Sequence, residues 1–310
     1  MKSEKQVNIE LLCLKIEKIM EAERININVS MNRYTSFRTG GNADAMVIVE
    51  SEVELKNVLR LFSEEKVPHI ILGNGSNILI KDGGYRGVIV KLGENFNSIE
   101  VKDHIITAHA GSKISAVAKE AMEHGLSGLE FASGIPGSVG GGVFMNAGAY
   151  GGELKDIILS VRAITKDGGK DYEVSNEEMQ LGYRHSTFQE NGDIIISATF
   201  QLKTGEKRAI ATEMKALMDR RNQKQPVNLP SAGSFFKRPE GYFAGKLIQD
   251  SGLKGLSVGG AQVSPLHAGF IVNNGTATAT DILNLMKLIQ NTVFNKFGVK
   301  LEPEVRILGD

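Results

Sequence analysis

Ser133-Gly-Ile-Pro-Gly-Ser-Val-Gly-Gly-Gly-Val-Phe-Met-Asn-Ala-Gly-Ala-Tyr-Gly-Gly152 contains eight glycines in twenty residues. Glycine adopts backbone angles that other residues avoid, and without a Cβ it lets main-chain N–H groups approach a flat anionic ligand. A second glycine loop, Leu72-Gly-Asn-Gly-Ser-Asn77, lies upstream and adds side-chain donors. Two such loops predict backbone capture of a diphosphate, and therefore a dinucleotide cofactor in an extended pose. The alternative is two sets of tight turns that bind no ligand.

Strands and helices alternate upstream of the run. Residues 45–50 form a continuous β-type stretch, Ser51-Glu-Val-Glu54 is a capping box that opens a helix to about Lys66, and residues 69–72 form the next strand. This spacing predicts a strand–helix–strand unit with a right-handed crossover, followed by a third strand at 87–92.

The remaining elements predict an α+β chain in three parts, 1–95, 96–206 and 207–310. We expect Ser112 to cap a helix that closes at Gly125, and Asp167-Gly168 to form a turn. The other expected elements are a helix at 8–22, a polar link at 26–33, strands at 105–110, 159–165 and 193–202, helices at 207–224, 242–251 and 280–297, a stiff linker at 225–230, and an extended segment at 299–308.

Composition excludes several classes of protein. The 310 residues include 36 basic and 36 acidic side chains, and a net charge of zero argues against nucleic-acid binding by bulk electrostatics. A single cysteine, Cys13, permits no intramolecular disulfide, and the six histidines show no metal-ligand spacing, so we expect no metal. No apolar run reaches the ~18 residues that a membrane span needs. The N-terminus does not resemble a signal peptide, and we expect a cytosolic protein.

The common nucleotide and hydrolase motifs are absent. Gly73-x-Gly75 lacks the third glycine of a dinucleotide fingerprint, because Ile78 stands in its place. The stretch Gly241 to Leu247 is one residue too short for a phosphate-binding P-loop and lacks the magnesium-binding Ser or Thr. No Gly-x-Ser-x-Gly nucleophile elbow occurs.

Six ordered motifs cover nearly the whole chain after residue 30: YTSFRTGG (34–41), LGNGSN (72–77), SGIPGSVGG (133–141) with NAGA (146–149), GYRHS (182–186), AGSFFK (232–237) and LEPEVR (301–306). In this order they resemble the UDP-N-acetylenolpyruvoylglucosamine reductase family of peptidoglycan precursor synthesis. The resemblance implies two FAD-binding subdomains of the vanillyl-alcohol-oxidase type and a third, substrate-binding domain. It also implies noncovalent FAD, NADPH as hydride donor, and a UDP-sugar enolpyruvyl ether as substrate. Only about thirty residues separate Arg238-Pro239 from Val272, so the chain resembles the shorter type without an extra tyrosine loop.

The same resemblance assigns residues to the cofactor, with Tyr34 and Arg38 as supports of the site. The expected FAD contacts are Leu72, Gly73, Asn74, Gly75, Ser76, Asn77, Ser133, Gly134, Ile135, Pro136, Gly137, Val139, Gly140, Asn146, Ala147, Gly148, Ala149 and Ile196.

Three residues match the family's catalytic positions. Arg184 is expected to face the substrate carboxylate, since a planar guanidinium suits a bidentate contact. Ser234 is expected to donate the proton to C2 of the reduced substrate. Glu304 matches the catalytic glutamate, and we expect a raised pKa because a charged carboxylate would oppose the forming dianion. Glu302 lies on the same face of the extended segment and competes for this role, while Pro303 predicts an edge strand or bulge.

The UDP-sugar phosphates call for cationic and polar partners. The expected substrate contacts are Tyr183, Lys237, Lys254, His267 and Arg306. Two other functions stay open: an oxidase or dehydrogenase on the same flavin fold, disfavoured because no His or Cys sits beside the glycine loops for covalent attachment, and a colourless nucleotide-sugar binding protein. We expect a monomer or a weak oligomer.

Overall fold

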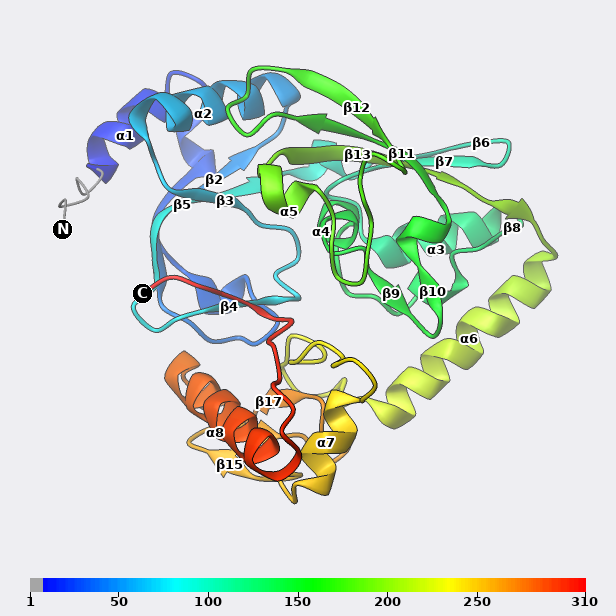
Figure 1. Ribbon diagram of the computed structural model, residues 1–310. Coiled ribbons are helices and arrows are strands. Elements are labelled where there is room, and N and C mark those ends of the chain that lie inside the picture. Colours follow the sequence, from blue (N-terminus) through cyan, green and yellow to red (C-terminus); the bar gives the residue numbers. More distant parts are fainter. Residues whose placement is uncertain (1–7) are drawn as a thin grey trace. The chain divides into compact units, whose positions relative to one another are not determined.

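The computed structural model describes residues 8–310, which divide into two compact units (Figure 1). The described part of unit 1 comprises residues 8–28, Asp44–Gly73 and Gly87–Met218, and unit 2 comprises Val29–Ala43, Asn74–Arg86 and Asp219–Asp310. The α+β class is confirmed by the mixture of helices and strands. The division into 1–95, 96–206 and 207–310 stays a prediction.

The first sheet has the strand order β1-β2-β5-β3. Its strands are β1 (Ile25–Ser30), β2 (Asn42–Val49), β5 (Tyr85–Leu92) and β3 (His69–Ile71), and β3 pairs in parallel with β5. The polar link expected at 26–33 is therefore wrong, because residues 25–30 form a strand. The helix expected at 8–22 is also too long: α1 spans Ile9–Ile16. Apolar residues of α1 and of α2 (Glu52–Glu65) share one core with β2 and β5.

Helix α2 begins with half of the expected capping box. The Ser51 side chain accepts a hydrogen bond from the Glu54 amide at 3.2 Å. The Glu54 carboxylate binds both terminal nitrogens of Arg24 at 2.7 Å and accepts from the Glu50 amide at 2.8 Å. A bidentate guanidinium is a stronger partner than the Ser51 amide, so the reciprocal bond of the box is replaced by an ion pair.

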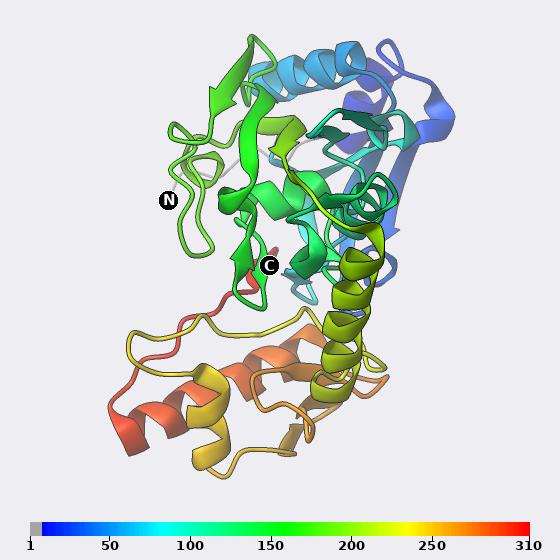
Figure 2. The same ribbon diagram turned by 90° about the vertical axis from the view of Figure 1, so that its right-hand side faces the viewer.

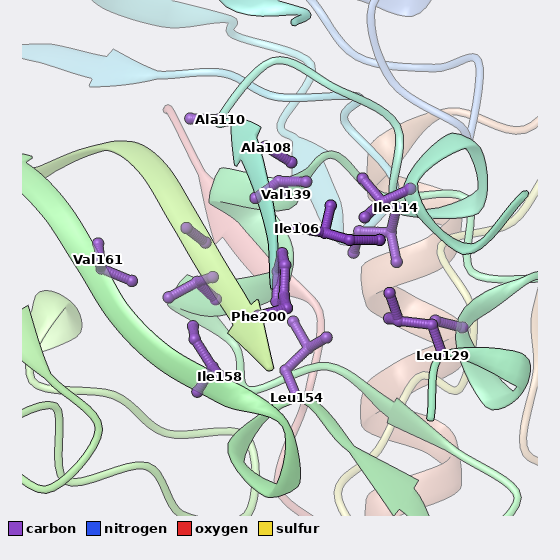
Figure 3. Packing of buried hydrophobic residues seen from close by; sticks show 14 of the residues in the cluster. Ile106, Ala108, Ala110, Ile114, Leu129, Val139, Leu154, Ile158, Val161 and Phe200 are labelled. Atoms are coloured by element: carbon purple, nitrogen blue, oxygen red, sulfur yellow. The ribbon is translucent and has the colours of Figure 1, made fainter. Parts of the chain in front are cut away.

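The second sheet has the order β12-β11-β13-β7-β6 and is antiparallel throughout. Its strands are β6 (Ile99–Lys102), β7 (Ile105–His109), β11 (Ile158–Ile164), β12 (Asp171–Ser175) and β13 (Ile194–Gln201), and α3 (Ile114–Glu123) and α4 (Val139–Phe144) pack against it. Figure 3 shows the resulting core, in which Ile114 and Val139 of the helices lie near Ile106 and Phe200 of the sheet.

Two turn predictions in this region have different outcomes. Gly168, at φ 71°, lies in the turn between β11 and β12, which confirms the Asp167-Gly168 turn. Gly125, at φ 64°, follows α3 as expected. Ser112 does not cap α3: Lys113 holds the cap position, and the Ser112 hydroxyl donates to the Ser98 carbonyl at 3.2 Å instead.

Unit 2 has its own hydrophobic core, to which α7 (Ala244–Asp250) and α8 (Ala279–Phe297) contribute buried residues. A three-stranded sheet of β15 (Ser257–Val258), β16 (Ala261–Val263) and β17 (Ile271–Asn273) packs with α8, and β4 (Ile78–Ile80) pairs in parallel with β18 (Arg306–Leu308). Helix α6 spans Lys207–Lys224, as predicted, and is one continuous helix in both views (Figures 1 and 2). The short remaining elements are β8 (Leu126–Ser127), β9 (Gly148–Ala149), β10 (Gly152–Glu153), α5 (Phe188–Asn191) and β14 (Lys203–Thr204).

Candidate active site

The middle of the glycine run forms helix α4, and two of its glycines serve packing. A Cβ on Gly140 would lie 3.0 Å from the Cβ of Ala110, and one on Gly142 would lie closer than 3.0 Å to the Ile114 side chain. These glycines let α4 lie directly on β7 and α3. For Gly140 and Gly142 the structure thus gives a reason other than ligand binding, as the alternative of a purely structural run requires.

The end of the run is a β-hairpin. Strands β9 and β10 pair with each other, and Tyr150 and Gly151 form the turn between them, with φ values of 54° and 93°. Two consecutive residues in the left-handed region are typical of the tight hairpin turns that match strand twist. A Cβ on Gly152 would meet the Phe131 ring at 2.5 Å, so this glycine too is required by packing.

The beginning of the run keeps the properties of a ligand-binding loop. The amides of Gly134 and Gly137 donate no hydrogen bond to any residue within 8–310, and the same holds for the amide of Gly73 in the upstream loop. The two loops touch, because a Cβ on Gly73 would lie closer than 3.0 Å to the Ser138 hydroxyl oxygen. Unpaired main-chain donors on two adjoining loops fit the phosphates of a dinucleotide.

Lys91 supports this surface, and the sequence analysis missed it. Its ammonium donates to the Gly73 carbonyl at 3.3 Å, and burial lowers the pKa of Lys91 below its ordinary value. A partly buried cation under the loop would be favoured further by a bound diphosphate. The available signal was a lysine within the apolar strand Gly87 to Leu92.

Arg184 lies in a tight turn of unit 1 with φ 54°, a conformation that costs a non-glycine residue energy. The Gly182 amide donates to the His185 carbonyl at 3.1 Å, and the His185 amide donates back at 3.2 Å. The Arg184 guanidinium carbon lies 5.1 Å from the centre of the Tyr183 ring. This stacking keeps the two predicted substrate contacts together.

Asn146 joins the glycine run to that turn. Its side chain is fully buried; Nδ2 donates to the Gly182 carbonyl at 2.8 Å and to Glu153 at 2.9 Å, and Oδ1 accepts from the Lys155 amide at 3.0 Å. Hydrogen bonding from Lys155 is the main cause that lowers the pKa of Glu153, and the charge of Arg184 adds to it. The predicted cofactor residue Asn146 therefore uses its whole amide on structure around Arg184.

In unit 2 the Ser234 and Glu304 segments are paired. The Glu304 amide donates to the Phe235 carbonyl at 2.8 Å, and the Lys237 amide donates to the Glu302 carbonyl at 2.9 Å. On its other side, the Phe235 amide donates to the Gly269 carbonyl at 2.9 Å. An extended Ser234–Lys237 segment thus lies between two neighbours, because Ser234 forms an isolated bridge with Phe270 and Phe236 one with Pro303. Pro303 lies in no strand, so the edge strand or bulge expected there stays a prediction.

Asn77 and Gly75 connect the upstream loop to these segments. The Asn77 side chain donates to the Glu304 carbonyl at 3.2 Å, and its own carbonyl accepts from the Arg306 amide at 3.0 Å. Gly75, at φ 63°, lies against Tyr34, since a Cβ there would be closer than 3.0 Å to the Tyr34 carbonyl oxygen. The motif that contains Tyr34 thus supports the loop.

The other predicted substrate residues of unit 2 differ in environment. The His267 Nδ1 accepts from the Gly269 amide at 3.1 Å, and burial, with the charge of Lys254, lowers the pKa of His267. The Lys237 ammonium lies 3.9 Å from the exposed Glu302 carboxylate.

Several expected cofactor contacts are buried in the structure. Ile196 is fully buried and its carbonyl accepts from the Ala110 amide at 2.8 Å, so its side chain has no surface to offer a ligand. The side chains of Leu72 and Val139 are 1% exposed. Their roles as FAD contacts stay predictions, and the backbone is the part of these residues that could make such a contact.

Two negative findings apply to residues 8–310. No group of three or more His, Cys, Asp or Glu side chains is arranged to hold a metal ion. None of the helices in that range is both long and apolar enough to cross a membrane.

Two family descriptions match the chain. Residues 43–170 match an FAD binding domain, and residues 225–308 match the C-terminal domain of UDP-N-acetylenolpyruvoylglucosamine reductase. The first contains Gly73, Lys91 and the glycine run, and the second contains Ser234 and Glu304.

Known proteins match over almost their full length. A UDP-N-acetylenolpyruvoylglucosamine reductase of Clostridioides difficile is 51% identical over 98% of this chain and 100% of its own. One of Lactobacillus helveticus is 50% identical over 97% and 99%. The crystal structure of the enzyme from Thermus caldophilus is 35% identical with a TM-score of 0.81, covering 92% of this chain and 99% of that one. The chain belongs to the UDP-N-acetylenolpyruvoylglucosamine reductase family.

Proposed function

We propose that the chain reduces UDP-N-acetyl-3-O-(1-carboxyvinyl)-glucosamine to UDP-N-acetylmuramate, with FAD as noncovalent cofactor and NADPH as reductant, in peptidoglycan precursor synthesis. The observation that carries the proposal is the match to a reductase at 51% identity over 98% of this chain and 100% of the relative. A likeness that spans both chains from end to end includes the cofactor and substrate parts alike.

The residues that would hold FAD are the unpaired amides of Gly73, Gly134 and Gly137, with Lys91 behind the first loop. When bound, FAD supplies hydride transfer, accepting hydride from NADPH and delivering it to C3 of the enolpyruvyl group. The protein supplies binding, orientation and electrostatics. Because Cys13 is buried in α1, it is not available to attach a flavin covalently.

Arg184 stabilises the charge that develops on the substrate. Hydride addition at C3 pushes electrons into the carboxylate and forms a dianionic enediolate. A fixed guanidinium meets that charge best when its backbone is held before the substrate arrives, and loss of one such preorganised donor typically costs about 3–4 kcal/mol.

Ser234 supplies the proton that the reaction needs, and Glu304 supplies the protonated carboxyl. The Ser234 side chain is exposed, so its hydroxyl is available to protonate C2. Glu304 is partly buried and held in register with Phe235, while Glu302 is exposed and faces Lys237 at 3.9 Å. A carboxyl that must stay protonated needs shielding from water, and the lower exposure of Glu304 favours it over Glu302.

The UDP phosphates are met by Lys237, Lys254, His267 and Arg306, and Tyr183 contacts the sugar. The lowered pKa of His267 makes the ring neutral at pH 7. Since its Nδ1 accepts from the Gly269 amide, the proton lies on Nε2, and the ring donates to the substrate from there. A cytosolic location and a monomeric or weakly associated state belong to this proposal and are tested by fractionation and light scattering.

A flavin titration tests the function. The purified protein should be yellow, should bleach anaerobically with NADPH, and should regain its colour on addition of the enolpyruvyl UDP-sugar. Bleaching without recovery would remove the proposed substrate while leaving the flavin. A colourless protein that binds UDP-sugars would favour the non-catalytic alternative.

The Ser234→Ala variant tests the assigned acid. It should be reduced by NADPH at the normal rate and should fail to turn over the UDP-sugar, with a loss of roughly 10²–10⁴ in rate. Ser257→Ala, at an exposed serine of β15, is the matched control and should behave like the unmodified protein. Loss of the NADPH half-reaction in Ser234→Ala would disprove the role as acid.

A further inference from the structure

We propose that Gln189 is a positioning residue for Arg184, holding its strained turn against the last carbonyl of helix α4. The inference rests on the proposed function, because Arg184 acts on the substrate carboxylate only if the chain reduces the UDP-sugar. Arg184, Gln189 and α4 all belong to unit 1.

Arg184 needs an external clamp because its own turn is short. Its φ of 54° is unfavourable for a residue with a side chain. The turn closes with two backbone bonds between Gly182 and His185, at 3.1 and 3.2 Å. The His185 amide lies in the same peptide group as the Arg184 carbonyl, so the second bond holds one side of that group. What binds the Arg184 carbonyl holds the other side.

Gln189 binds that carbonyl. Its Nε2 donates to the Arg184 carbonyl at 3.0 Å and to the Phe144 carbonyl at 2.8 Å. Phe144 is the last residue of α4, and carbonyls at a helix C-terminus lack intrahelical partners. One amide group therefore ties the carbonyl of the proposed catalytic arginine to the end of the glycine-run helix.

Two other side chains fix the same turn to the same helix end. The buried Ser186 hydroxyl donates to the Phe144 carbonyl at 2.7 Å, and the buried Asn146 holds the Gly182 carbonyl at 2.8 Å. These two anchor the residues on either side of Arg184. Gln189 is the one of the three clamping side chains that acts on Arg184 itself.

Gln189 is also the clamp that can be changed without unfolding the protein. Its side chain is exposed, whereas Asn146 and Ser186 are completely buried, so their replacement would leave unsatisfied polar groups. Gln189→Leu keeps a branched side chain, one atom shorter, and removes both N–H donors. Gln189→Lys restores an N–H donor at similar reach, and Gln201→Leu, at an exposed glutamine of β13, is the matched control.

The test separates the two half-reactions in the holoenzyme. We expect Gln189→Leu to slow reoxidation of the reduced flavin by the enolpyruvyl UDP-sugar about ten- to hundredfold, since small misplacements of a catalytic group have effects of that size. NADPH reduction of the flavin and the melting temperature should stay as in the unmodified protein. The Kd for UDP-N-acetylmuramate, from the flavin difference spectrum, should change less than the rate, because the product carries one carboxylate charge rather than a developing second one.

Each outcome bears on the inference. Normal reoxidation in Gln189→Leu, or an equal loss in the Gln201→Leu control, would overturn it. Failure of Gln189→Lys to recover the rate would also overturn it, since the proposal requires only a donor at that place. If the unmodified protein itself is not reoxidised by the UDP-sugar, the proposed function fails, and that result is recognised before any variant is compared.

Discussion

The contact between the two glycine loops predicts that Gly73→Ala is harmful only while Ser138 keeps its hydroxyl. A Cβ on Gly73 would lie closer than 3.0 Å to the Ser138 oxygen but 3.5 Å from the Ser138 Cβ. The second distance is an ordinary van der Waals contact. Gly73 does not have the positive φ that would itself forbid alanine. The clash therefore comes from one atom.

The magnitude follows from three terms. Forcing an extra methyl into a packed site costs about 1–3 kcal/mol. A Gly-to-Ala change also stabilises the protein by roughly 0.4–1 kcal/mol, because it reduces the conformational freedom of the unfolded chain. Ser138 also caps α4 by accepting from the Gly141 amide at 3.4 Å, so Ser138→Ala alone costs about 1 kcal/mol. Gly73→Ala alone should thus cost about 1–2 kcal/mol, and the double variant should cost no more than Ser138→Ala.

A double-mutant cycle measures this coupling. Urea unfolding of the four proteins at one fixed FAD concentration gives the free energies, and flavin fluorescence gives the FAD Kd. Gly141→Ala is the matched control, because its Cβ would lie 3.4 Å from the same Ser138 oxygen and should be tolerated. Additive costs, within the roughly 0.3–0.5 kcal/mol expected for independent sites, would show that the loops do not touch.

Three further predictions test other parts of the chain. Glu54→Gln should destabilise the protein by about 1.5–3 kcal/mol near pH 7, since it breaks a hydrogen-bonded ion pair with Arg24. The bond with Arg24 is the main cause that lowers the pKa of Glu54 from 4.5, so this contribution is complete above pH 4.5 and is lost as the pH falls through the lowered pKa. A difference in unfolding free energy between the variant and the unmodified protein that stays constant from pH 7 to 3 would contradict this. Lys91→Met should weaken FAD binding but leave the FAD-free protein as stable or more stable at pH 7, because burial lowers the pKa of Lys91 and disfavours its charge. The stability gained by the variant should shrink as the pH rises toward 10.5. A calorimetric scan at pH 7 in which the FAD-free variant melts below the unmodified protein would refute this. Asn77→Asp removes the donor to the Glu304 carbonyl, so stopped-flow reoxidation by the UDP-sugar should slow about tenfold, and an unchanged rate would exclude this support of Glu304.

The elements that the sequence predicted best are those with long, regular patterns. Helix α6 begins and ends at the predicted residues, and α8 begins one residue earlier than expected. β1 was missed although Ile25, Ile27 and Val29 alternate with polar residues, the period-2 pattern of a strand. Its two asparagines are residues depleted in strands, and they favoured the interpretation as a polar link. Ser112 failed as a cap because the Ser98 carbonyl, fourteen positions away, accepts its hydroxyl. Local signals decide an element only where no tertiary partner competes for the same group.

The candidate site divides in the same way. The motifs predicted roles for Arg184, Ser234 and Glu304, because residue type and order within a short segment are enough for such a prediction. The residues that hold them in place are not visible in a motif: Gln189 lies 45 positions from Phe144, and Asn77 lies 227 positions from Glu304. Only the fold brings these groups within hydrogen-bonding distance.

The glycine run shows why composition alone overstates a binding loop. Gly140, Gly142, Gly148 and Gly152 are fixed by close neighbouring atoms, and Gly151 by the φ of a hairpin turn. The Gly141 amide donates to the Ser138 hydroxyl within α4. Gly134 and Gly137 remain, and their amides donate to no residue within 8–310. The packing glycines and the glycines proposed to bind FAD are adjacent because α4 must lie close to the sheet for its N-terminal loop to meet Gly73. The loop can therefore present its amides to a cofactor only because the glycines that follow it let the helix approach the core.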